Sequence, residues 1–500
     1  MDWLGVGLLL LVPVGLILTG LPAIVVILSA AALGAAALGF GGDEGFSLLT
    51  ALPNRVVALL ENDLLQALPL YVLMGALLNR LPVADALFGA GAALLPRGPA
   101  AALVSGMGLG ALLGPMNGSV GASVLALSRA MAPRLAANGV APAQRHAAVA
   151  VASTLGIVIP PSLVLILLGD AMFQAHTIAS RMAGRSARII NTQDVFHAAL
   201  APAGLFLLFC LILAWWTGRG QGVSSAPPAR STRIQALTAG VTVLFVVVLL
   251  AGVATGYFYA VEAAAMGAVS LLTVGILGRH LNLAGLSDVL RDALAGTGAL
   301  FALLLAATTL TLVLRVLGTD RLVGDWLAAI PGGAMSATAV VLAIIGLSAF
   351  ALDAFEIIFV VVPIVIPPLL VRVADAQWVA VLVLLALQAS FVLPPVGYAL
   401  MMARSALGDA PPMRLVARAL APFLAAQLCV LALVLLEPGL VHLAGARANS
   451  GAALQAPVSD EEAAKSLRDM KPALPEPEIE DEPAPPKLRK LSRSGSSRVA

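Results

Sequence analysis

Apolar runs of about twenty residues recur along the chain from Leu4 to Leu436, with short polar stretches between them. Such a run has the length that an α-helix needs to cross the hydrocarbon core of a bilayer. The chain is 60% hydrophobic and only 11% charged, whereas soluble domains are about 25% charged. We therefore expect an all-α polytopic membrane protein.

The first half of the chain contains two apolar stretches that are interrupted. Residues 98–131 carry Gly114, Pro115 and Asn117 in their middle, which would leave backbone groups unpaired in lipid. We predict a re-entrant hairpin there, with its tip buried in protein. Residues 146–169 are predicted to form a helix broken at Pro160 and Pro161. Uninterrupted spans are predicted near Leu4–Leu18, Ala23–Leu38, Leu65–Leu78 and Ala198–Trp216.

The same order returns after a predicted linker at residues 218–235, which is rich in Gly, Ser, Pro and Arg. Residues 336–371 are apolar except for Asp353 and Glu356, and we interpret them as a second hairpin. Residues 377–403 are predicted to form a second broken helix, interrupted at Pro394 and Pro395. Uninterrupted spans are predicted near Ala236–Val253, Ala263–Leu277, Ala299–Leu314 and Leu415–Leu436.

This order predicts two repeats, at residues 1–217 and 236–440, each with about five spans, a hairpin and a broken helix. An odd number of crossings inverts the second repeat relative to the first, and inverted repeats with broken helices are typical of secondary transporters. Arginines are denser in the loops of one side, which the positive-inside rule makes cytoplasmic, so both termini are expected outside. Residues 449–500 are rich in proline and charge and are predicted to be disordered.

Broken helices free carbonyl oxygens and expose helix ends inside a membrane. Carbonyl oxygens suit a hard cation, and a helix N-terminus suits an anion. The competing interpretation is that proline and glycine merely kink packed helices, but two breaks beside two hairpins at matching places favour a site. The substrate-binding candidates are Ser153, Thr154, Gln388, Pro394 and Arg404.

Two of the polar candidates have simpler alternatives. Arg404 could pair with an anionic solute or anchor the cytoplasmic end of its helix. Asp353 could act in function or cap the returning helix of the second hairpin. The five histidines and two cysteines show no ligand-like spacing, so no metal other than a coupling ion is expected. The net charge of +2 gives no indication of nucleic-acid binding.

Several motifs resemble the large membrane subunit of the tripartite ATP-independent periplasmic (TRAP) transporters. The most specific one runs from Ser153-Thr154-Leu155-Gly156 to Pro160-Pro161-Ser162, and others are Glu262 to Gly267, Leu352-Asp353 and Pro394-Pro395-Val396-Gly397. The resemblance extends from about Leu4 to Leu436. Two departures are Asn117, where the family often has Ser, and Tyr259-Ala260-Val261, where it usually has Thr-Pro-Thr.

The resemblance implies a sodium-coupled importer of the elevator type in a bacterial inner membrane, with sodium as the coupling ion and no other cofactor. It implies a small organic acid as solute, delivered by a periplasmic substrate-binding protein, and a small four-span membrane subunit as partner. By the same resemblance, one sodium site would include Asn117, Ser119, Gly156 and Pro161. The other would include Ala349, Asp353 and Ser390.

Three alternatives stay open at this point. A stand-alone sodium/dicarboxylate symporter would need no binding protein. A membrane-embedded enzyme would need convergent His, Asp or Glu side chains, which the sequence does not show. A passive channel would need a continuous pore, whereas paired hairpins in inverted halves fit alternating access better. We therefore expect a transporter subunit and not an enzyme.

Overall fold

The structure is a computed structural model, and it describes residues 2–39, 53–54, 56–57, 59–62, 65–94, 98–117, 119–183, 190–219, 233–394, 397–409 and 411–443. Every regular element in these ranges is helical, so the predicted all-α class is confirmed. The predicted tail at 449–500 and most of the predicted linker at 218–235 lie outside the described residues.

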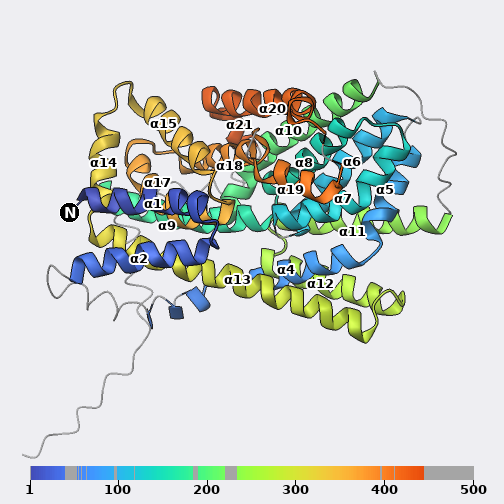
Figure 1. The fold of residues 1–500 in the computed structure, drawn as a ribbon, viewed down its shortest axis with the longest axis horizontal. Helices are drawn as coiled ribbons and strands as arrows, with labels where there is room; N and C mark the ends of the chain where they lie inside the picture. Colours follow the sequence, from blue (N-terminus) through green and yellow to red (C-terminus); the bar gives the residue numbers. More distant parts are fainter. Residues whose placement is uncertain are drawn as a thin grey trace, which may run out of the picture. The chain divides into compact units, whose positions relative to one another are not determined.

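The helices of the first half follow the predicted order (Figure 1). They are α1 (Asp2–Thr19), α2 (Ala23–Gly39), α4 (Ala67–Arg80), α5 (Val83–Leu94), α6 (Pro99–Leu113), the 3₁₀ helix η1 (Gly114–Asn117), α7 (Val120–Ala137), α8 (Pro142–Val158), α9 (Leu163–Ala183) and α10 (Thr192–Arg219). The first hairpin therefore consists of α6, η1 and α7, and the first broken helix consists of α8 and α9.

The second half repeats this order with one added interruption. Its helices are α11 (Arg233–Ala254), α12 (Ala260–Leu277), α13 (Leu283–Val316), α14 (Thr319–Ala329), α15 (Gly333–Ser348), α16 (Ala354–Glu356), the π-helix η2 (Ile357–Val361), α17 (Val362–Arg372), α18 (Ala376–Val392), α19 (Tyr398–Leu407), α20 (Met413–Leu436) and α21 (Gly439–His442). The second hairpin runs from α15 to α17, and α18 with α19 forms the second broken helix.

Seven described helices are long and apolar enough to cross a membrane, or eight if α4 and α5, which meet at 65°, count as one bent span. Shorter apolar helices include α1, α2 and α18. Each predicted uninterrupted span coincides with a helix, namely α1, α2, α4, α10, α11, α12, α13 and α20. The number of crossings and the side of the membrane on which each loop lies stay predictions.

The predicted end of the first broken helix, near residue 169, is wrong. Helix α9 continues to Ala183. Gln174 Nε2 donates to Asp170 Oδ2 one turn earlier, at 2.8 Å. Ala175 and Ala179 are buried on the same face, so packing stabilises the last turns of α9, which also carry Gln174, His176 and Arg181.

Four long helices form a layer along one side of the molecule, seen along the lower part of Figure 1. We call α2, α4, α12 and α13 the side layer, and α6–α10 with α15–α20 the hairpin core. In the side layer α2 packs on α13, and α4 packs on α12 and α13. Gly34 makes the first contact possible, because a Cβ there would lie 2.4 Å from Val313 Cγ1, as in other close helix crossings of membrane proteins.

Helices of one half pack on helices of the other half in matching pairs. In chain order α1, α2, α4 and α5 of the first half correspond to α11, α12, α13 and α14 of the second half. Helix α2 packs on α13, and the corresponding pair is α12 on α4. Helix α5 packs on α11, and the corresponding pair is α14 on α1. In the hairpin core α7 packs on α19, and α17 packs on α9. Two structurally related repeats would produce such an exchange of partners. The inverted orientation of the halves in the membrane stays a prediction.

Helix α18 lies at the centre of the hairpin core and is held there by buried hydrogen bonds. Trp378 Nε1 donates to the carbonyl of Val434 at 2.7 Å. That carbonyl lacks its usual helical donor because residue 438 is proline. Gln427 Nε2 of α20 donates to the Leu385 carbonyl at 3.0 Å. These bonds fix the helix whose end forms the second break.

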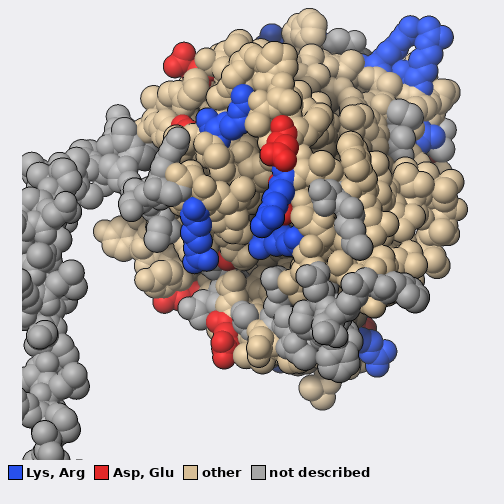
Figure 2. All heavy atoms as spheres, turned by 90° about the vertical axis from the view of Figure 1, so that its left-hand side faces the viewer, with Lys and Arg blue, Asp and Glu red and all other residues tan. Residues whose placement is uncertain are grey.

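The end of the molecule at α14 has a mixed surface. Figure 2 shows basic and acidic side chains close together there, on a surface that is mostly neither. Helix α14 itself carries Asp320, Arg321 and Asp325. Because both signs are interleaved, this end presents no single-sign field that would by itself select a charged partner.

Candidate functional site

The break between α8 and α9 deprives two backbone carbonyls of their helical amide donors. In a continuous helix the carbonyls of Gly156 and Ile157 would accept from the amides of residues 160 and 161, and both of these residues are proline. Ser162 Oγ replaces one donor, since it donates to the Ile157 carbonyl at 2.9 Å. We therefore take the Gly156 carbonyl, which loses the amide of residue 160, as the candidate ligand at this break.

The tip of the first hairpin lies directly on this break. A Cβ on Gly156 would stand 2.2 Å from the carbonyl carbon of Gly114, and one on Gly114 would stand 2.7 Å from the Cα of Gly156. No side chain fits between these backbones, so both positions require glycine. The contact brings the end of α6 against the end of α8.

A small cavity lies where the hairpin tip and the break meet. Its polar lining comes from Ser119 and Ser123 of the hairpin, Ser153 of α8, Ser162, and the backbone of Gly114 and Gly156. It offers about 10 Å³ to the centre of a water-sized sphere, which is about the room that one water needs. A monovalent cation surrounded by hydroxyl and carbonyl oxygens would fit this space and this donor set.

Two of the four residues predicted for the first sodium site line this cavity. They are Ser119, whose Oγ also accepts from the Ala122 amide at 3.2 Å, and Gly156. Pro161 is not among the lining residues and acts instead by removing the amide donor of Ile157. Asn117 is buried at the hairpin tip, and both polar atoms of its side chain lack a hydrogen-bond partner among the described residues.

Sequence reasoning missed two of the serines that line the cavity, Ser123 and Ser162. Ser123 follows Ser119 by four residues on α7, so both lie on one helix face. Ser162 follows the proline pair directly, where a hydroxyl can replace a missing amide donor. Both patterns are present in the sequence, but they indicate a shared site only when the first hairpin is known to contact the first break.

The second break reproduces this chemistry. Pro394 and Pro395 remove the helical donors of Ser390 and Phe391. The Leu393 amide donates to the Ser390 carbonyl at 3.3 Å and replaces one of these donors. The Phe391 carbonyl has no helical amide donor because residue 395 is proline. Gly397 passes close to that carbonyl, because a Cβ there would lie 2.6 Å from it.

Gln388 joins the two breaks. Its Nε2 donates to the carbonyl of Thr154 at 3.3 Å, while its buried Oε1 has no hydrogen-bond partner in the described part of the chain. The hydroxyls of Ser153 and Thr154 donate to the carbonyls of Ala150 and Val151 in their own helix. Three of the predicted substrate-binding candidates, Ser153, Thr154 and Gln388, therefore lie where α8 crosses α18.

Asp353 of the second hairpin acts as a helix cap. Its Oδ1 accepts from the Ala354 amide at 2.7 Å, and its own amide donates to Glu356 Oε2 at 3.0 Å. Ser390 Oγ donates within its own helix, to the Leu387 carbonyl at 2.7 Å. These bonds of Asp353 and Ser390 are local, and Ala349 ends α15, so the second predicted sodium site stays a prediction.

Two further polar groups near the second hairpin were not predicted. Glu356 is buried with its carboxylate on the Asp353 amide. Tyr398 begins α19, and its hydroxyl lies next to the first hairpin, 2.8 Å from where a Cβ on Gly121 would stand. The sequence signal for Glu356 was its place one turn after Asp353 in an apolar stretch, whereas the position of Tyr398 depends on packing between the halves.

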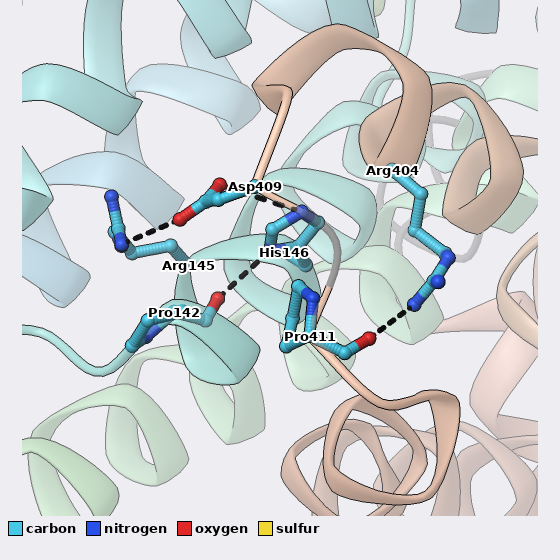
Figure 3. Close-up of polar contacts among 6 residues, drawn as sticks. All are labelled: Pro142, Arg145, His146, Arg404, Asp409 and Pro411. Carbon is cyan, nitrogen blue, oxygen red and sulfur yellow. Dashed lines mark hydrogen bonds and ion pairs between the residues drawn. The ribbon is translucent and has the colours of Figure 1, made fainter.

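Arg404 contacts a loop and not the breaks. Its Nη1 donates to the carbonyl of Pro411 at 2.8 Å (Figure 3). The same loop is tied to α8, because Arg145 Nη2 lies 2.8 Å from Asp409 Oδ2. His146 is fully buried beside this pair, and its Nδ1 donates to the Pro142 carbonyl at 2.8 Å. The observed contact agrees with an anchoring role for Arg404.

The helices and the two breaks define a multi-pass membrane transport protein. The chain matches the model of the tripartite ATP-independent periplasmic transporter, DctM component, over residues 3–440. It therefore belongs to this family. The family and the apolar helices place it in a bacterial inner membrane. Because its relatives are transporter permease subunits, the prediction that it is not an enzyme is confirmed.

Two curated relatives carry permease names. The chain is 24% identical over 290 residues to the C4-dicarboxylate TRAP transporter large permease protein DctM of Rhodobacter capsulatus, covering 56% of this chain and 65% of that protein. It thus spans just under two thirds of that relative. It is 23% identical over 388 residues to the sialic acid TRAP transporter large permease protein SiaM of Vibrio cholerae serotype O1, covering 76% of this chain and 85% of that protein.

A solved structure has the same fold. The YdaH transporter of Alcanivorax borkumensis, described as having an unusual topology, superposes with a TM-score of 0.60 at 15% identity. The superposition covers 80% of this chain and 90% of that one. At this identity the likeness concerns the fold alone.

Proposed function

We propose that this chain is the permease of a sodium-driven importer that carries a small organic acid across the inner membrane. In this proposal a periplasmic binding protein delivers the acid, and a small four-span membrane subunit completes the complex. The observation that carries the proposal is the cavity that Gly156, whose carbonyl has no helical amide donor at residue 160, lines together with Ser119, Ser123 and Ser162.

The cavity combines a cation environment with an anion environment. The C-terminal ends of α6 and α8 meet there, and helix C-termini carry partial negative charge that favours a cation. Helices α7 and α9 begin at the same cavity, at Val120 and Leu163, and their N-termini carry partial positive charge that favours a carboxylate. Binding of the cation would thus support binding of the acid next to it.

The proposed mechanism is alternating access of the elevator type. The hairpin core would carry the cation and the acid past the side layer as one body. Gln388 would keep the two breaks in register during this movement, because it links α18 to the Thr154 carbonyl of α8. The names of the two relatives, a C4-dicarboxylate permease and a sialic acid permease, support an acidic solute.

Uptake into proteoliposomes tests the proposal. A panel of labelled organic acids would be offered with and without an inward sodium gradient, and with and without the small subunit and the binding protein. We expect uptake of an acid that requires sodium and both partners. Uptake by this chain alone would favour a stand-alone symporter, and uptake that ignores the sodium gradient would contradict sodium coupling.

A further inference from the structure

The side layer touches the tips of both hairpins, each through one helix. Helix α4 contacts η1 at the tip of the first hairpin, and α13 contacts η2 just after the tip of the second. These two helices hold the same place in the order of their halves. The chemistry of the two contacts is nevertheless different.

The contact of α4 is a close approach of two backbones. A Cβ on Gly75 would stand 2.7 Å from the carbonyl oxygen of Asn117 and 3.0 Å from its carbon. Nothing but the hydrogen of a glycine fits there, and the contact does not depend on a side-chain hydrogen bond. Such a surface can separate from its partner without leaving a broken polar bond behind.

The contact of α13 is a directed hydrogen bond. Thr311 is 5% exposed, and its Oγ1 donates to the carbonyl of Phe359 at 3.2 Å. A regular helix would pair that carbonyl with the amide of residue 363, which is proline. The carbonyl lies in the π-helix η2, a form of helix that occurs often at functional sites. Thr311 thus adds a side-chain donor from α13 to a hairpin carbonyl that cannot form the regular bond to the fourth following residue.

Two threonines on the same helix show that this arrangement is particular to Thr311. Thr308 and Thr309 both donate to the carbonyl of Leu305 within α13, at 3.0 and 2.7 Å. This bond within one helix is the usual choice for a threonine hydroxyl. Thr311 instead donates across an interface, to the hairpin.

We propose that Thr311 is a positioning residue that stabilises the conformation in which the second hairpin is docked on α13. The inference rests on the proposed alternating access, because only then does the hairpin move relative to the side layer. When the hairpin leaves, the Phe359 carbonyl loses the Thr311 hydroxyl, whereas the Gly75 contact has no side-chain hydrogen bond to lose. Thr311 therefore biases the equilibrium toward the docked state and sets how readily the hairpin core departs.

Pulsed electron paramagnetic resonance on the full chain in lipid nanodiscs tests this role. Spin labels would be placed at Leu294 of α13 and Leu428 of α20, which are 73% and 47% exposed, after replacing Cys210 and Cys429 by alanine. The wild type should give two distance populations whose ratio changes with sodium. Thr311→Val keeps the shape but removes the donor, and should lower the docked population roughly 2- to 10-fold.

Two matched variants separate positioning from packing. Thr311→Ser keeps the hydroxyl and should keep the wild-type ratio of the two distance populations. Thr309→Val removes a hydroxyl that bonds within α13 and should also leave this ratio unchanged. The inference is overturned if Thr311→Val leaves the ratio unchanged, if Thr309→Val shifts it equally, or if the wild type shows one distance under every sodium condition. Uptake in proteoliposomes is measured separately, so a failure of the proposed transport is distinguished from a failure of this assignment.

Discussion

Replacement of Gly156 by alanine probes the geometry of the proposed cation cavity. The new Cβ would lie 2.2 Å from the carbonyl carbon of Gly114 and 2.5 Å from its Cα and oxygen. Ordinary contact begins at 3.4 Å, so the break and the hairpin tip must separate by about 3.4 − 2.2 = 1.2 Å at this point. The atoms in conflict are backbone, and no side chain can rotate away.

The expected consequence is a weaker response to sodium with the fold retained. Oxygen ligands of hard cations lie within a range of about 0.3 Å, so a 1.2 Å displacement removes the Gly156 carbonyl from the ligand set. We expect the sodium concentration for half-maximal uptake to rise at least about tenfold, which corresponds to about 1.4 kcal/mol. Overpacking should also cost about 1–3 kcal/mol of stability.

Gly108→Ala provides the matched control. Gly108 lies in α6 of the same hairpin, and a Cβ there would meet no atom within 4 Å. Its replacement should leave the sodium response unchanged and stabilise the helix slightly, by about 0.5–1 kcal/mol. A wild-type sodium response in Gly156→Ala, or an equal loss in Gly108→Ala, would refute the reasoning.

Three further changes test contacts around the site. Gln388→Leu removes the link to the Thr154 carbonyl and should lower the maximal uptake rate several-fold; a normal rate would contradict its role. Glu356→Gln keeps an acceptor for the Asp353 amide, so its free energy of unfolding should stay near that of the wild type. Glu356→Ala removes the acceptor and should lower the free energy of unfolding by about 1 kcal/mol. Equal melting temperatures of the two variants would argue against the cap. Arg145→Gln and Asp409→Asn should show a coupling of about 0.2–1 kcal/mol in a double-mutant cycle of unfolding, because their ion pair is partly exposed; additive effects would exclude it.

The class of fold could be predicted from the sequence because the bilayer constrains it so strongly. An apolar run must form a helix in lipid, and a proline pair inside such a run must break it. Both breaks follow from this alone, since Pro160 and Pro394 interrupt otherwise apolar stretches. The extension of α9 to Ala183 escaped prediction, because polar residues at its end are compensated by packing that only the structure shows.

The candidate site could be predicted only in part, because its lining depends on contacts between distant segments. Ser119 and Gly156 were implied by the family resemblance, whereas Ser123 and Ser162 could be assigned to the site only from the contact between the first hairpin and the first break. Tyr398 reaches the first hairpin from the other half of the chain, which no local pattern reveals. Arg404 lies near the second break in the sequence and was therefore a substrate-binding candidate, but its guanidinium donates to the loop carbonyl of Pro411.

Binding of radioactive sodium to the purified chain tests whether the cavity at the first break is a cation site. We expect saturable binding that potassium does not displace, and that falls about tenfold or more when Ser119 and Ser123 are both replaced by alanine. A matched pair of replacements at Ser336 and Ser348, whose hydroxyls bond their own segments, should leave it unchanged. The absence of saturable sodium binding, or binding that is unaffected by the loss of Ser119 and Ser123, would contradict the account.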